Sequence, residues 1–62
     1  MTLNLDPNLT DADDVYQALL DAHDGLTKDE SDAFNARLIL ILCNHIGSSD
    51  TVRAALRAAQ FT

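Results

Sequence analysis

Leu38-Ile39-Leu40-Ile41-Leu42-Cys43 is the stretch that decides the fold of this 62-residue chain. It lies within a longer segment of helical spacing, and at about 100° per residue its apolar side chains extend almost all the way round the helix. A helix that is apolar on nearly every side is normally enclosed, and two short helices of the same chain cover only part of it. The sequence therefore predicts an interface with a partner, which includes Arg37, Ile39, Leu40, Cys43 and Asn44.

The apolar stretch belongs to a helix with clear start and stop signals. Thr27 and Glu30 have the spacing of a capping box, and Gly47 is a typical helix terminator, so a helix is predicted over residues 28–46. Apolar residues at helical spacing predict another helix over residues 11–24. Because the connection between the two is short, they are expected to form an antiparallel hairpin.

The outer helices have weaker signals. Thr10 is the candidate cap of the first helix, and Gly25 is expected to end it in the left-handed conformation. Ser48 or Ser49 is the candidate cap of a short third helix, predicted over residues 50–60.

The N-terminal segment and the C-terminal aromatic residue are expected to pack on the helices. Residues 1–9 form an extended arm in this prediction, because Pro7 restricts the residue before it to extended geometry. Leu5 and Leu9 are expected to lie against the helices of this chain or of a neighbour, since exposed leucines are unfavourable in water. Phe61 is expected to complete the packing of the three helices.

The predicted fold class is all-α, a single small domain over residues 1–62 with an N-terminal arm, a helical hairpin and a short third helix. A chain of this size buries only about 60% of its unfolded surface. One cysteine excludes an internal disulfide, and no cluster of metal ligands is visible. Oligomerisation or a partner is therefore expected to complete the fold.

The charge of the chain is acidic and unevenly distributed. The net charge is −6, with nine acidic residues and one lysine in residues 1–32 and one acidic residue and three arginines in residues 33–62. A negative field repels phosphates, so neither nucleic acid nor an anionic membrane is expected as a partner. The apolar stretch is far shorter than the roughly 18 residues of a membrane span, and the N-terminus lacks a secretory signal. A cytoplasmic location is therefore expected, with Cys43 as a reduced thiol buried like a small apolar side chain.

No residue pattern in this chain predicts catalysis, a cofactor or a bound metal. Cys43 and His45 lie about 200° apart on a helix, so they cannot bind one ion. A thiol among apolar neighbours is a poor nucleophile, because such surroundings disfavour the thiolate. His45 is expected instead to be a half-buried histidine on the face of Phe34 and Leu38, bonded to a carbonyl or an acid. The protein is not expected to be an enzyme.

Three alternatives stay open at this point. Arg37 and Asn44 are either the solvent-facing side of the central helix or the anchor of its interface. A small ligand-binding or catalytic protein would use a pocket lined by His23, His45 and Tyr16. An acidic regulator would occupy a basic groove on another protein through Asp11, Asp13, Asp14 and Asp21.

Several segments together resemble a known family. These are the arm Leu3–Leu9, the segment Tyr16–Leu26, and Asn35-Ala36-Arg37-Leu38 followed by apolar residues and Asn44-His45-Ile46-Gly47. They resemble a bacterial domain-of-unknown-function family of short, stand-alone proteins, whose genes often accompany flavin-dependent hydroxylases of aromatic-compound breakdown. No biochemical role comes with that family. The resemblance implies a non-enzymatic accessory protein that binds itself or a larger enzyme, with a flavin-dependent aromatic monooxygenase as the candidate.

Overall fold

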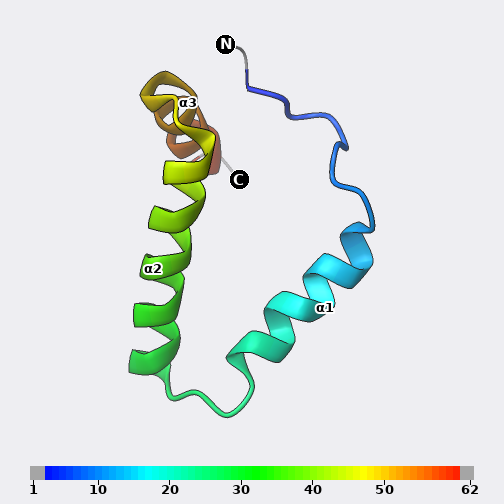
Figure 1. The fold of residues 1–62 in the computed structure, drawn as a ribbon, viewed down its shortest axis with the longest axis vertical. Helices are drawn as coiled ribbons and strands as arrows, with labels where there is room; N and C mark the ends of the chain where they lie inside the picture. The colour runs from blue at the N-terminus through cyan, green and yellow to red at the C-terminus, as the bar shows by residue number, and fades with distance from the viewer. Residues whose placement is uncertain (1–2, 61–62) are drawn as a thin grey trace.

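A computed structural model describes residues 3–60 as an extended arm followed by three helices (Figure 1). The helices are α1 (Ala12–His23), α2 (Lys28–Ile46) and α3 (Ser49–Ala59), and there is no strand in the described range. The predicted all-α class is confirmed, and the helix bounds lie within one residue of the predicted ranges. Phe61 lies outside the described residues.

Both ends of α2 are fixed by the groups that the sequence predicts. The Thr27 amide donates to Glu30 Oε1 at 2.9 Å, and the Glu30 amide donates to Thr27 Oγ1 at 3.2 Å, which completes a capping box. Gly47 adopts a φ of 78° and donates its amide to the Cys43 carbonyl at 3.0 Å. A glycine suits this position because a Cβ atom is strained in the left-handed region.

The two outer helices start in different ways. Ser48 caps α3, since its Oγ accepts from the Thr51 amide at 3.2 Å, and Ser49 is already helical. The predicted cap at Thr10 is wrong. Asp11 stands at the N-cap of α1 with a φ of 55° and makes no side-chain cap bond. Thr10 is therefore one residue further from the free amides of the first turn than a capping side chain needs to be.

The predicted hairpin is open rather than packed. The chain reverses at the turn after α1, but α1 and α2 diverge from that turn, and the arm runs back toward the end of the molecule that carries α3 (Figure 1). The most extensive contact between helices is that of α2 with α3. The radius of gyration is 13.3 Å, whereas a compact chain of this length has about 10.6 Å. The single chain is extended.

This open arrangement leaves the described chain without a core. No residue between positions 3 and 60 is buried. Leu5 and Leu9 are 76% and 62% exposed, so the prediction that they lie against the helices is wrong within one chain. His45 is exposed, so the prediction that it is half-buried is wrong. It lies near the C-terminal end of α2, where α1 has diverged and no other described helix covers this side (Figure 1). Cys43 is only partly covered.

Candidate interaction surface

Three apolar faces run along α2. Helical spacing places Phe34, Leu38 and Leu42 on the face toward α1, where Phe34 and Leu38 are half-buried and Leu42 is exposed. A second face points toward α3. The third, which we call the outer face, points away from both helices and consists of Arg37, Leu40, Ile41 and Asn44. Leu40 is 70% exposed, which leaves a large apolar side chain of this face in water.

The face toward α3 forms one wall of a groove that we call the apolar groove. Its principal lining residues are Ile39, Cys43 and Ile46 of α2 with Val52, Ala55 and Leu56 of α3. Contact between the two helices closes the floor only partly, so Ile39 stays 56% exposed and Leu56 59% exposed. None of these lining residues has a polar side chain that could orient a small ligand. Binding sites for small molecules normally contain a few such polar groups.

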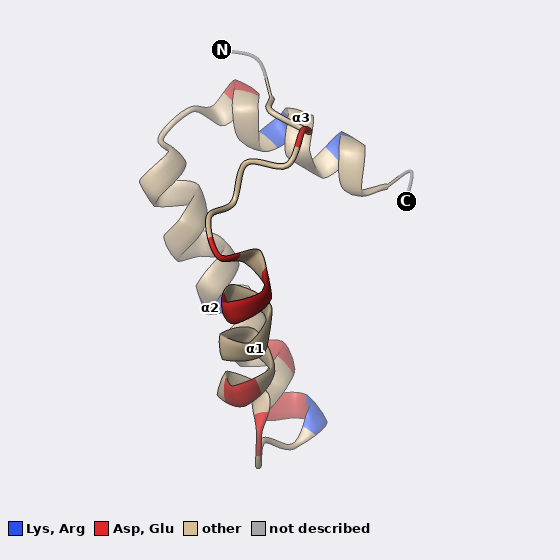
Figure 2. Cartoon of the chain, turned by 90° about the vertical axis from the view of Figure 1, so that its right-hand side faces the viewer, with Lys and Arg blue, Asp and Glu red and all other residues tan. Residues whose placement is uncertain are grey.

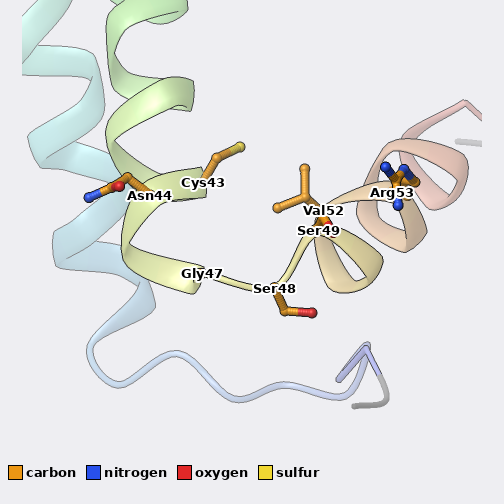
Figure 3. Close-up of a pocket in the computed structure, with 7 residues that line it drawn as sticks. All are labelled: Cys43, Asn44, Gly47, Ser48, Ser49, Val52 and Arg53. Carbon is orange, nitrogen blue, oxygen red and sulfur yellow. The ribbon is translucent and has the colours of Figure 1, made fainter.

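A second hollow lies at the junction of α2 and α3 (Figure 3). Cys43 points from α2 into the space beside Val52 of α3, whereas Asn44 points to the other side of α2 (Figure 3). The Ser48 hydroxyl is engaged with the Thr51 amide and hydroxyl, as the cap of α3. The polar groups around this hollow therefore do not converge on one point, as a catalytic or binding constellation requires.

One polar link joins α1 to α2 near the turn. The ring of His23 bonds through Nδ1 to the Leu19 carbonyl at 2.6 Å and through Nε2 to Asn35 Oδ1 at 2.8 Å. Its ring also meets Phe34 edge-on, with the ring centroids 5.1 Å apart. The bond to the Leu19 carbonyl, followed by the bond to Asn35, raises the pKa of His23 above its ordinary value of 6.5, and slight burial opposes this. Both partners are acceptors in this arrangement, so it suits the doubly protonated ring.

Asn35 was not predicted as a partner of this histidine. The sequence does contain a signal for this contact. A histidine ends one predicted helix, and a polar residue lies in the first half of the next helix, across a short turn. The link is structural, because it joins two helices of the same chain and leaves no ring nitrogen free.

The structure does not bring together the residues of the predicted ligand pocket. His45 lies ten residues beyond Asn35 on α2, which is about 15 Å along the helix axis. His23 is therefore distant from His45, and Tyr16 is exposed on α1. Among residues 3–60, no group of three or more histidine, cysteine and acidic side chains is arranged to hold a metal ion. Within the same range, no helix combines the length and apolar character needed to cross a membrane.

The charges follow the division into helices. Most acidic residues lie on the arm, on α1 and at the start of α2 (Figure 2). Helix α3 carries Arg53, Arg57 and one acid, Asp50, and the second half of α2 carries no acid, lysine or arginine. The ion pairs seen in the described part of the chain are local and exposed, between Lys28 and Asp32 at 2.8 Å and between Arg53 and Asp50 at 3.5 Å. Neither pair joins one helix to another.

Comparison with known proteins assigns the chain to a family without assigning an activity. Residues 3–61 match the family described as protein of unknown function (DUF2783). The chain belongs to this family. No curated protein and no solved structure matches it. The match covers nearly the whole chain, so the arm and all three helices are part of what this DUF2783 protein shares with the family.

Within this DUF2783 chain, the five residues predicted for the interface separate into two groups. Ile39 and Cys43 line the apolar groove beside α3. Arg37, Leu40 and Asn44 belong to the outer face, with Arg37 and Asn44 exposed at its polar margin. The predicted surface is therefore two surfaces of α2, about a third of a turn apart, and each offers apolar area to a different neighbour.

Proposed function

We propose that this protein is a non-enzymatic accessory protein that acts by binding a larger enzyme through the outer face of α2. One observation carries the proposal: no residue from 3 to 60 is buried, while Leu40 and Ile41 are 70% and 64% exposed in the middle of the longest helix. Exposed apolar surface costs about 25 cal/mol per Å² relative to burial. A helix with this composition is stabilised when another surface covers it.

The composition of the outer face supports a protein partner. Leu40 and Ile41 supply its apolar area, and Arg37 and Asn44 lie between their directions, one turn to either side along the helix. Protein interfaces commonly combine apolar area with polar groups in this way. Arginine is enriched at binding hot spots because its guanidinium pairs with a carboxylate in a planar, two-bond geometry. An amphipathic helix that lies in a groove of a larger protein is a common mode of recognition.

The identity of the enzyme is proposed from the resemblance described above. The family that the sequence resembles implies an association with flavin-dependent hydroxylases of aromatic compounds, and this expectation supports a flavin-dependent aromatic monooxygenase as the partner. The accessory protein would stabilise that enzyme or cover one of its mobile regions. The proposal places the complex in the cytoplasm.

The test compares two leucine-to-aspartate variants in binding to a flavin-dependent aromatic hydroxylase, the proposed partner. Leu40→Asp puts a charge at the centre of the outer face and is expected to weaken binding by at least about 30-fold, the effect of losing a hot spot. Leu9→Asp is the matched control, because Leu9 is similarly exposed but lies on the arm. Calorimetric titration measures the affinity, and circular dichroism checks that helicity is retained. Equal affinities of the two variants would refute the proposal.

Ionic strength separates this proposal from the acidic-regulator alternative. Binding through Leu40 and Ile41 should respond little to added salt, because apolar contact is not screened. Binding through the carboxylates of α1 should weaken steeply with salt and should be lost on Asp14→Asn. The second pattern would assign the function to α1.

A further inference from the structure

We infer that the apolar groove between α2 and α3 receives helix α1 of a second copy of this chain, in a two-fold dimer with both grooves filled in the same way. The inference goes beyond the proposed function, because it concerns the groove and α1 rather than the outer face. Such an interface is closed and uses the same two surfaces of each copy.

The exposed area of the single chain fits a dimer. The chain exposes 5505 Å², whereas a compact monomer of its mass, 6.7 kDa, exposes about 3,900 Å². The excess is about 1,600 Å² per chain, by the same scaling. Each partner of a standard interface contributes about 800 Å², and obligate dimers contribute more. The excess is therefore sufficient for a stable dimer.

The size and chemistry of the groove suit side chains of a helix. Its volume is about 250 Å³, below the roughly 300–1,000 Å³ of sites for small molecules. Ile39, Ile46 and Leu56 present branched apolar side chains to it from two helices. A ridge of apolar side chains from a third helix fills such a space by interdigitation.

Helix α1 has the matching ridge, and its own chain does not cover it. Val15, Tyr16, Leu19 and Leu20 recur at helical spacing, and all four are exposed. The bond from His23 to Asn35 holds the C-terminal end of α1 against the first half of α2. From there α1 diverges from α2, so its ridge does not reach the groove of its own chain (Figure 1). The α1 helix of a second copy is not tied to this α2, so its ridge is free to reach the groove.

The charges beside the two surfaces are complementary. On α1, helical spacing puts Asp13 one turn before Tyr16, at the edge of the ridge. On α3, Arg53 lies one turn before Leu56 at the edge of the groove, and Arg57 lies further round the helix. The acidic half of one copy therefore meets the arginine-bearing half of the other. Complementary charges of this kind fix the register of an interface.

A pair of charge reversals in the full chain tests the dimer by sedimentation velocity. Asp13→Lys alone and Arg53→Glu alone each create two repulsive contacts per homodimer, and each is expected to raise the dimer Kd by about 10-fold or more. An equimolar mixture of the two variants restores one attractive contact and leaves the other intact. The mixture is therefore expected to form heterodimers with an affinity near that of the unchanged chain.

An apolar variant makes the test independent of the charges. Leu56→Asp is expected to abolish dimerisation, whereas the control Leu9→Asp retains it, and circular dichroism reports whether each variant is helical. A monomeric unchanged chain, a mixture that forms no heterodimer, or a dimer unaffected by Leu56→Asp would each overturn the inference. Enzyme binding that survives Leu56→Asp but not Leu40→Asp would leave the proposed function standing, so the two failures are distinguishable.

Discussion

The first half of α2 is held to α1 by a hydrogen bond, whereas its C-terminal half meets α3 through apolar contacts that remain open to water. At the first end, a capping box and the link from His23 to Asn35 satisfy their polar groups within the chain. At the second, Ile39 and Leu56 border a groove that no other side chain from residues 3–60 fills. A hydrogen bond needs only two well-placed atoms, whereas burial of an apolar side chain needs a whole covering surface. A chain this short can satisfy its polar groups, but it does not have enough surface to cover its apolar ones.

The largest expected effect is a loss of stability on dilution, which tests whether a second copy covers the apolar C-terminal half of α2. If a second copy fills the groove, dissociation accompanies unfolding, and a roughly 100-fold dilution lowers the free energy of unfolding by about 2.7 kcal/mol. Thermal melting followed by circular dichroism at the two concentrations measures the change. Leu56→Asp is the control, since its melting temperature should not depend on concentration. A melting temperature of the unchanged chain that is equal at both concentrations would show that the groove is not completed by a copy.

The next effect concerns the capping box at the start of α2, whose polar groups are satisfied within the chain. Thr27→Ala removes the oxygen that accepts from the Glu30 amide and is expected to cost about 1 kcal/mol of stability. Thr27→Ser keeps that oxygen and should cost much less. Because the capping box is local, the loss should be the same at low and high protein concentration. Equal losses for the alanine and serine variants in chemical denaturation would mean that the hydroxyl does not stabilise α2.

The same contrast explains what the sequence predicts well. The bounds of α2 depend on residues within four positions of each other, such as Thr27 with Glu30 and Cys43 with Gly47, so they can be predicted from spacing alone. Thr10 shows the limit of this rule. A left-handed Asp11 shifts the start of α1 by one residue, and nothing in the sequence distinguishes the two starts.

Features that depend on the angle between helices could not be predicted. The sequence indicates a hairpin, but it does not fix how far α1 and α2 diverge, and this angle decides whether Leu42 and His45 are covered. It also decides which residue of α2 meets His23, so Asn35 was missed. The excess of apolar surface on α2 was predictable because it follows from composition and helical period. Its division between an outer face and a groove follows from the position of α3.

The smallest expected effect concerns the pH dependence of the link between α1 and α2. The pKa of His23 is raised in the folded chain, chiefly by the bond to the Leu19 carbonyl and then by the bond to Asn35. A group whose pKa is raised on folding binds protons more tightly in the folded state. Its contribution to stability is therefore complete below the unfolded pKa of about 6.5 and is lost as the pH rises through the raised value.

Titration of the His23 ring by NMR and denaturation at pH values on both sides of that window measure this dependence. Asn35→Ala removes one of the two acceptors and should lower the pKa of His23 only in part, because the larger cause, the Leu19 carbonyl, remains. His23→Gln should remove the histidine's share of the pH dependence altogether. A pKa of His23 at or below 6.5 in the folded chain would mean that the ring does not hold the two helices in this way, and the capping box would then stabilise α2 without fixing it to α1.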